Sequence, residues 1–130
     1  LKVKVIENKP IGVFVSQNNI KYLLLENNKI IKDYENYNFL PKIYGNKAHE
    51  NFFDFYKNLK KTKINTKLIK KFKYYDINRW DLFLIDGKII KLPPENFINS
   101  LEKFSEIYEK SEFSGFKVFD FRIKNELILK

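Results

Sequence analysis

The sequence predicts an α+β fold, in which a largely antiparallel sheet of about seven to nine strands carries two packed helices and ends in a C-terminal edge hairpin. Short apolar runs, many with period-two alternation, recur between Asn-rich, Asp-Gly or Pro-containing breaks. Two longer segments, around residues 52–59 and 97–108, repeat apolar residues every three or four positions, as amphipathic helices do. Thirteen Phe and eight Tyr in 130 residues favour half-buried sheet faces over a helical bundle.

The N-terminal part of the chain predicts short strands. Residues 2–7 alternate until Asn8-Lys9-Pro10 ends the pattern, which predicts a strand that enters from an upstream part. Apolar runs at residues 11–16, 20–25 and 30–31 are joined by Asn-rich turns, and Asn tolerates the left-handed backbone of tight turns. We expect these three runs to form an antiparallel meander.

The middle of the chain predicts a helix and three further strands. An apolar stripe within residues 52–59 predicts a helix that covers one face of the sheet. Apolar runs at residues 68–75, 79–85 and 88–92 predict strands. Asp86-Gly87 joins the last two, and this dipeptide favours a type I′ hairpin turn.

The C-terminal part predicts a second helix and a closing hairpin. Pro93-Pro94 ends the preceding strand and can start a helix, because the first helical position does not need an N–H donor. Residues 118–123 alternate, and Asn125-Glu126 interrupts the pattern before the apolar run 127–129, which predicts two short strands joined by a tight turn. If the last strand lies at a sheet edge, its unpaired N–H and C=O groups form a template for a strand of another chain. This edge is therefore the candidate functional site.

Composition limits the protein to one domain of ordinary size. The absence of Cys excludes disulfides and thiolate metal sites, and it leaves the cellular compartment open. The absence of Met predicts that Leu1 is not a translation start, so that the chain is a piece of a longer protein or a processed product. No stretch approaches the roughly 18 uninterrupted apolar residues of a membrane helix, although a removed anchor would leave no trace.

The net charge of +9 comes almost entirely from lysine, since Arg79 and Arg122 are the only arginines. Nucleic-acid readers prefer Arg for bidentate contacts, so no nucleic acid is expected, and scattered lysine mainly supports solubility. The lysine-dense stretch 57–73 is best explained as a solvated helix end and loop. Two alternatives stay open for it: a basic nucleic-acid-binding module with Tyr74 and Tyr75 as stacking surfaces, and a contact with anionic lipid.

The sequence offers little material for catalysis. His49 is the only imidazole, with no Cys to replace it, and we interpret it as a surface or capping residue near the start of the first helix. Four Asp residues are expected at turns or on the polar faces of strands, without the spacing of a calcium loop: Asp76, Asp81, Asp86 and Asp120. No catalytic residue, metal or cofactor is therefore predicted.

Trp80 is the only tryptophan and directly follows Arg79. The favoured interpretation places its indole in the core, between the sheet and a helix. The alternative makes Arg79 and Trp80 a secondary contact with a partner, because both residue types are enriched at interface hot spots.

The order of several motifs resembles the C-terminal part of the FtsQ/DivIB family of bacterial division proteins. Nearly the whole chain takes part in the resemblance. The motifs are Val5-Ile6-Glu7-Asn8-Lys9-Pro10-Ile11, similar to the family's Glu-Arg-x-Pro stretch; Leu40-Pro41 with Gly45, similar to its Leu-Pro-x-x-x-Gly loop; Arg79-Trp80-Asp81-Leu82; Asp86-Gly87; Lys91-Leu92-Pro93; and Val118-Phe119-Asp120-Phe121-Arg122.

The resemblance implies that residues 1–10 are the end of an upstream POTRA domain and its junction, and that residues 11–130 are the β domain. It implies a non-enzymatic protein anchored in the bacterial inner membrane by a missing N-terminal helix, with this domain on the periplasmic side. Its partners would be FtsB and FtsL-like proteins, which add a strand to the edge of the β domain at roughly micromolar strength or somewhat tighter.

Carried over by position, Ile123, Asn125, Leu127 and Leu129 lie beside the partner, with Arg122 nearby. Ile128 completes the six predicted partner-binding residues, and a charge-reversing or proline change at Leu127 or Ile128 is expected to abolish binding while the fold remains. This sequence departs from well-known members at some of these places. Those members have Tyr and Ser where Ile123 and Asn125 stand, and a Trp near the end that is absent here. Ladder hydrogen bonds do not depend on residue type, so the binding mode can carry over without the same side-chain anchors.

Overall fold

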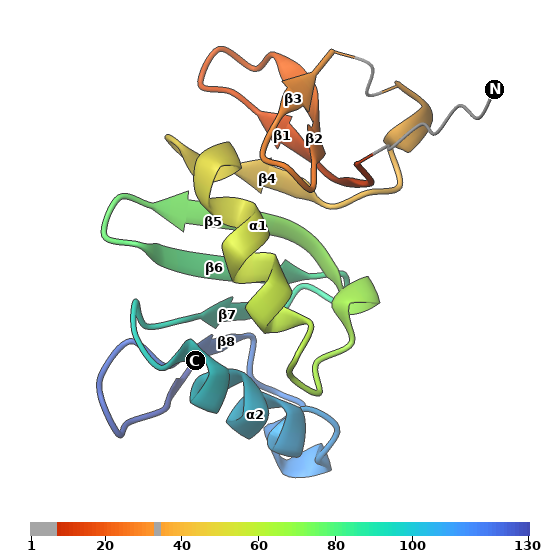
Figure 1. Ribbon diagram of the computed structural model, residues 1–130. Coiled ribbons are helices and arrows are strands. Elements are labelled where there is room, and N and C mark those ends of the chain that lie inside the picture. Colours follow the sequence, from red (N-terminus) through yellow and green to blue (C-terminus); the bar gives the residue numbers. More distant parts are fainter. Residues whose placement is uncertain (1–7, 33–34) are drawn as a thin grey trace, which may run out of the picture.

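The structure is a computed structural model that describes residues 8–32 and 35–130. Within these residues the chain forms one nine-stranded sheet, in the order β3-β2-β1-β4-β5-β6-β7-β8-β9, with two α-helices packed on it (Figure 1). The strands are β1 (Pro10–Val15), β2 (Lys21–Leu25), β3 (Ile30–Ile31), β4 (Lys42–Tyr44), β5 (Ile69–Tyr75), β6 (Arg79–Leu84), β7 (Ile89–Lys91), β8 (Val118–Asp120) and β9 (Ile128–Leu129). The helices are α1 (Ala48–Leu59) and α2 (Phe97–Ile107), with short 3-10 helices η1 (Glu35–Tyr37), η2 (Thr66–Leu68) and η3 (Ser111–Phe113).

These elements confirm the predicted fold class. The meander β1-β2-β3 is antiparallel, as are β5-β6-β7 and the closing pair β8-β9. Three pairings are parallel, namely β1-β4, β4-β5 and β7-β8. α1 lies in the connection from β4 to β5 and α2 in the connection from β7 to β8, because parallel neighbours need a long crossover. The strand predicted at residues 2–7 lies outside the described residues.

The turns follow the expected chemistry, with one correction. Asn19 and Asn28, in the turns of the meander, both have positive φ, which Asn tolerates. At Asp86-Gly87 the hairpin forms, but only Gly87 has positive φ, at 91°. The Gly87 N–H donates to the Leu84 carbonyl at 3.1 Å. The connection is therefore a type I turn followed by a left-handed glycine, and not the predicted type I′ turn.

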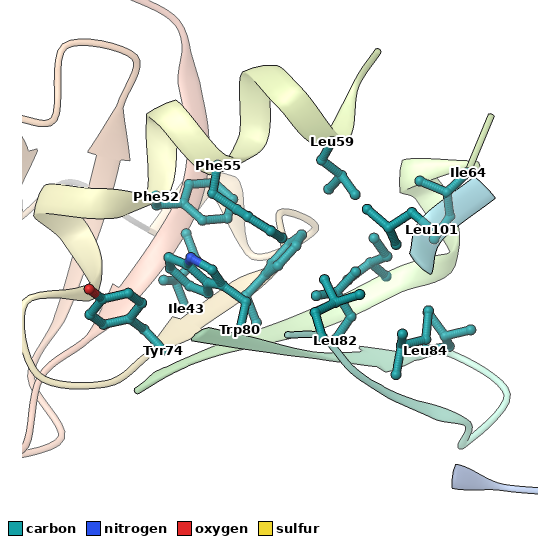
Figure 2. Close-up of a cluster of buried hydrophobic side chains, with 14 of the residues drawn as sticks. Ile43, Phe52, Phe55, Leu59, Ile64, Tyr74, Trp80, Leu82, Leu84 and Leu101 are labelled. Carbon is teal, nitrogen blue, oxygen red and sulfur yellow. The ribbon is translucent and has the colours of Figure 1, made fainter. Parts of the chain in front are cut away.

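Both helices pack on the same sheet face and enclose one core. Phe52 and Phe55 of α1 contact the Trp80 ring, with ring centroids 5.7 and 5.0 Å apart, and Figure 2 shows the indole between α1 and the sheet. Leu101 and Phe104 of α2 belong to the same cluster of buried side chains. The prediction that Trp80 lies in the core is confirmed, since the residue is 3% exposed.

Gly45 leads the chain from β4 into α1 and is required there for two reasons. Its φ of +120° lies in a region that residues with a Cβ rarely adopt. A Cβ at this position would stand 2.4 Å from the Tyr74 carbonyl oxygen. The close approach of this loop to β5 therefore depends on glycine.

The C-terminal hairpin differs from its prediction in one respect. β8 ends at Asp120, and β9 pairs with it antiparallel through Phe119↔Leu129 and Asp120↔Ile128. A loop of residues 121–127 joins them where a tight turn was expected. Just after β8, the Asp120 carboxylate accepts a hydrogen bond from the Arg122 backbone N–H at 3.0 Å, a local bond that competes with a continued strand ladder.

Candidate partner-binding edge

β9 is the last strand of the sheet and has a neighbouring strand on one side only within the described part of the chain. Lys130 and Val118 exchange two backbone hydrogen bonds, each 3.1 Å long. Because hydrogen-bonded and non-hydrogen-bonded pairs alternate in an antiparallel ladder, Leu129 is in a non-hydrogen-bonded pair with Phe119. The N–H and C=O of Leu129 therefore point away from β8. The C=O of Leu127 does so too, because it shares a planar trans peptide with the Ile128 N–H, which points toward β8.

The side chains of this edge strand alternate as well. Leu127 and Leu129 are partly buried and pack against the core on the helix side of the sheet. Ile128 lies between them and faces the opposite side. The edge is thus held in place by its own leucines while it leaves backbone groups unpaired.

Arg122 is fixed beside this edge by Asp120. Its Nε and one terminal nitrogen donate to the two carboxylate oxygens of Asp120, at 2.9 and 2.7 Å. Hydrogen bonding to Arg122 holds the pKa of Asp120 below its ordinary value, against the opposing effect of burial. The same hydrogen bond raises the pKa of Arg122. The Asp120 side chain is 6% exposed and that of Arg122 is 43% exposed, so the pair presents a positive group at the surface.

A cavity of about 520 Å³ lies between the 121–127 loop and the first turn of α2. Arg122, Ile123, Asn125 and Leu127 line it from the loop. Residues 93–96 and Lys103 line it from the other side. Sequence patterns did not reveal this cavity, because its two walls are about 25 residues apart and meet only through the parallel β7-β8 pairing.

The structure brings the six predicted partner-binding residues to one place. Four of them line the cavity, and Ile128 and Leu129 form the adjacent edge strand. Ile123 and Asn125 were expected beside a partner strand, but they lie in the loop. Ile123 is 50% exposed, and Asn125 has a φ of 63° that suits the turn.

The possible secondary contact at Arg79 and Trp80 is buried. Arg79 is 7% exposed and forms an ion pair with Asp81, and its guanidinium lies 4.4 Å from the centre of the Tyr75 ring. Trp80 lies in the core. Both residues stabilise the sheet, and neither presents a side chain to a partner.

Two of the Asp residues are placed differently from the prediction. Asp81 and Asp120 are 3% and 4% exposed, because each is paired with an arginine two residues away along the chain. Among the described residues, no group of three or more His, Cys, Asp or Glu is arranged to hold a metal ion.

His49 is half-buried in the first turn of α1, where its ring packs 4.5 Å from that of Phe14.

The basic stretch 57–73 does not present the predicted aromatic platform. Tyr74 is 9% exposed and packs on Trp80 with ring centroids 4.8 Å apart. Burial, followed by the charge of Asp76, raises the pKa of Tyr74. Tyr74 is therefore a core residue, which removes half of the proposed stacking surface for nucleic acid.

None of the helices in the described residues combines the length and the apolar character needed to span a membrane.

Comparison with known proteins points to one family. Residues 13–122 match the family model described as the C-terminal region of cell division protein FtsQ/DivIB. A search of curated proteins finds no match. Among solved structures, the chain is similar to the major extracytoplasmic domain of the bacterial cell division protein DivIB from Geobacillus stearothermophilus. The two share 16% identity with a TM-score of 0.54, over 79% of this chain and 92% of that one, which shows a common fold.

The family model spans most of the sheet, from β1 through β8 to Arg122, and the solved relative has the same fold. The chain therefore belongs to the C-terminal domain family of the cell division proteins FtsQ and DivIB.

Proposed function

We propose that this domain is a non-enzymatic scaffold of the bacterial division machinery, and that it binds an FtsB/FtsL-like partner by strand addition to β9. In this proposal the full protein is anchored in the inner membrane by a helix that precedes this chain, and the domain lies on the periplasmic side. Residues 1–10 would be the junction to a POTRA domain and residues 11–130 the β domain. Family membership supports the role in division.

The observation that carries the proposed binding mode is the unpaired backbone of β9. Leu129 directs its N–H and C=O away from β8, as Leu127 does its C=O, and the leucine side chains keep the strand in place. An incoming extended segment can complete this ladder without any change in the sheet. The strand contains only two residues, so the ladder alone would supply a small part of the binding energy.

Further binding energy would come from the adjacent cavity and from Arg122. A partner side chain that leaves the added strand on the helix side reaches the cavity between the 121–127 loop and α2. Arg122 uses two of its side-chain nitrogens for Asp120 and keeps further N–H groups for an acidic group of the partner. An apolar residue and a carboxylate near the strand are therefore the features we expect in the partner.

The test is an amide-resolved NMR titration with a peptide from the membrane-distal end of the cognate FtsB-like protein. The proposal predicts shifts on residues 122–130 and on the cavity wall formed by residues 93–96. Shifts confined to other surfaces, or no shifts at millimolar peptide, would contradict it.

A matched pair of proline variants separates the added ladder from the existing one. Leu129→Pro removes an N–H that points away from β8, so we expect a folded domain with at least roughly tenfold weaker binding. Ile128→Pro removes an N–H that points toward β8, so it should loosen the hairpin itself, whereas the sequence led us to expect that the fold would remain. Unchanged peptide affinity in folded Leu129→Pro would contradict strand addition.

A further inference from the structure

A second cavity, of about 430 Å³, lies away from the β9 edge, where β4 and β5 begin beside the turn between β6 and β7. Ten residues line it, and four of them are lysines while none is acidic. The lysines are Lys42, Lys67, Lys70 and Lys71. None of the four forms an ion pair in the described part of the chain. The cavity is therefore strongly positive and lacks internal neutralisation.

A β-bulge lies where two consecutive lysines of β5 line this cavity. Ile69 pairs with Leu84 and Lys71 pairs with Phe83, so Lys70 is an extra residue on β5. In a regular strand, neighbouring side chains would point to opposite faces. The bulge changes that alternation, and both Lys70 and Lys71 line the cavity.

The arrangement carries a cost in electrostatic repulsion that no ion pair among the described residues offsets. Lys42 and Lys71 are direct partners across the β4-β5 pair. Like charges in such opposed positions destabilise a sheet. Lys71 is also held in place, with its ammonium 4.3 Å from the centre of the Phe83 ring. A bound anion would offset the repulsion among the lysines.

The cavity also has an apolar wall. Phe39 is 78% exposed and Ile85 is 60% exposed, and both line the cavity.

Hydrogen bonds order the segments around the second cavity. The Ile85 N–H donates to the Leu68 carbonyl at 2.8 Å, and the Asn65 side chain accepts from the Lys67 N–H at 3.1 Å. The site is thus largely preformed, with exposed hydrophobic groups beside unpaired cations.

From these observations we infer that this second cavity is a docking site for an acidic segment of another protein, with an aliphatic or aromatic residue between its carboxylates. The volume suits a few side chains. The carboxylates match the four lysines, and the apolar residue matches Phe39 and Ile85. A membrane surface would favour a broad convex patch, whereas this site is a small cavity between the 38–42 segment, η2 and the start of β5.

The test uses the 130-residue chain and a defined probe, the capped peptide acetyl-Glu-Asp-Leu-Phe-Asp-Glu-amide. NMR titration should shift the amides of residues 38–42, 67–71 and 85, and raising the salt from about 0.05 M to about 0.5 M should weaken binding. A peptide with Lys in place of each acid should not bind, and one with Ser in place of Leu-Phe should bind more weakly.

Variants localise the effect. The double variant Lys67→Glu/Lys70→Glu should lower affinity for the acidic peptide by roughly tenfold or more. Lys61→Glu/Lys63→Glu makes the same change of net charge on exposed lysines outside the cavity, and it should leave most of the affinity intact. An equal loss in both variants would mean that only net charge matters and would overturn the proposal.

Two further probes distinguish other occupants. Vesicles of anionic phospholipid that shift these amides while the peptide does not would assign the cavity to a membrane surface and overturn the inference. Inorganic pyrophosphate that competes with the peptide at similar concentration would show an anion site without the apolar contact, which also contradicts it. Retained peptide binding in a Leu129→Pro background is expected, because the cavity and the β9 edge are separate.

Discussion

Two Arg–Asp pairs lie on the same face of the sheet, and each joins residues two positions apart, yet they differ in exposure. In the Arg79–Asp81 pair the side chains are 8% and 4% exposed, and the Tyr75 hydroxyl donates to Asp81 at 3.2 Å. In the Asp120–Arg122 pair the carboxylate is 6% exposed and the arginine is 43% exposed. The first pair is enclosed within the sheet, and the second presents its cation beside the free edge. Position in the sheet therefore decides whether the arginine of such a pair is enclosed or exposed.

The largest expected effect is on the enclosed pair. Asp81→Ala leaves the Arg79 guanidinium buried without its partner, which should lower the free energy of unfolding by about 3–5 kcal/mol. Urea denaturation followed by Trp80 fluorescence measures this change. Asp76→Ala, which alters an exposed Asp in the neighbouring turn, is the control and should change stability little. A similar small loss in both variants would show that the Arg79–Asp81 pair is not a major stabilising contact.

Asp120→Ala should have an intermediate effect. It removes the acceptor of the Arg122 backbone N–H and of two side-chain hydrogen bonds. Because Arg122 can return to water, the expected loss in unfolding free energy is smaller, about 1–2 kcal/mol. Hydrogen exchange should show that the loss is concentrated in the 121–127 loop and β9. A loss as large as that of Asp81→Ala would mean that the two pairs do not differ in their contribution.

The pH dependence of stability should also identify Asp120. Its pKa in the folded protein lies below the value of about 3.9 that Asp has when unfolded, so its contribution is present above that pH. The contribution is lost as the pH falls below about 4 toward the lower folded pKa, because the unfolded chain binds the proton first. Asp120→Asn should therefore be less stable than the original protein at neutral pH, and the difference should shrink in acid. A difference that is constant over this range would contradict the assignment.

The smallest stability effect is expected for Arg122→Ala. The guanidinium is half exposed, so its removal should change the free energy of unfolding by less than about 1 kcal/mol. Partner affinity should nevertheless fall by about tenfold if Arg122 donates hydrogen bonds to an acidic group of the partner. Isothermal titration calorimetry with the FtsB-like peptide measures this affinity. Lys124→Ala, an exposed residue of the same loop, is the control, and an equal loss there would show an effect of charge alone.

Local sequence patterns were sufficient for the elements whose causes are local. Apolar periodicity predicted α1 and α2, Asn marked the turns of the meander, and the apolar run 127–129 predicted the closing strand. The prediction that the closing hairpin lies at a sheet edge is confirmed, because β9 is the last strand in the sheet order. These features depend on residues within about ten positions of each other.

The remaining features depend on contacts between distant parts of the chain. The parallel pairings could not be predicted, because they depend on each helix returning the chain to the end of the sheet where the previous strand began. The burial of Asp81 was missed because Tyr75, which contacts both Asp81 and Arg79, lies on the neighbouring strand β5, and alternation within β6 does not reveal this contact. Both cavities escaped detection for the same reason, and the bulge at Lys70 interrupts the very alternation that was used to find β5.

The most direct measurement of the central claim is amide hydrogen exchange at residues 127, 128 and 129, with and without the FtsB-like peptide. In the free domain, Ile128 should be protected by its bond to β8, while Leu129 should exchange quickly because its N–H faces away from β8. Leu127 precedes the strand and should also exchange quickly. At saturating peptide, Leu127 and Leu129 should become protected and Ile128 should change little. A peptide that binds without protecting Leu127 or Leu129 would show that the partner does not extend the sheet at β9.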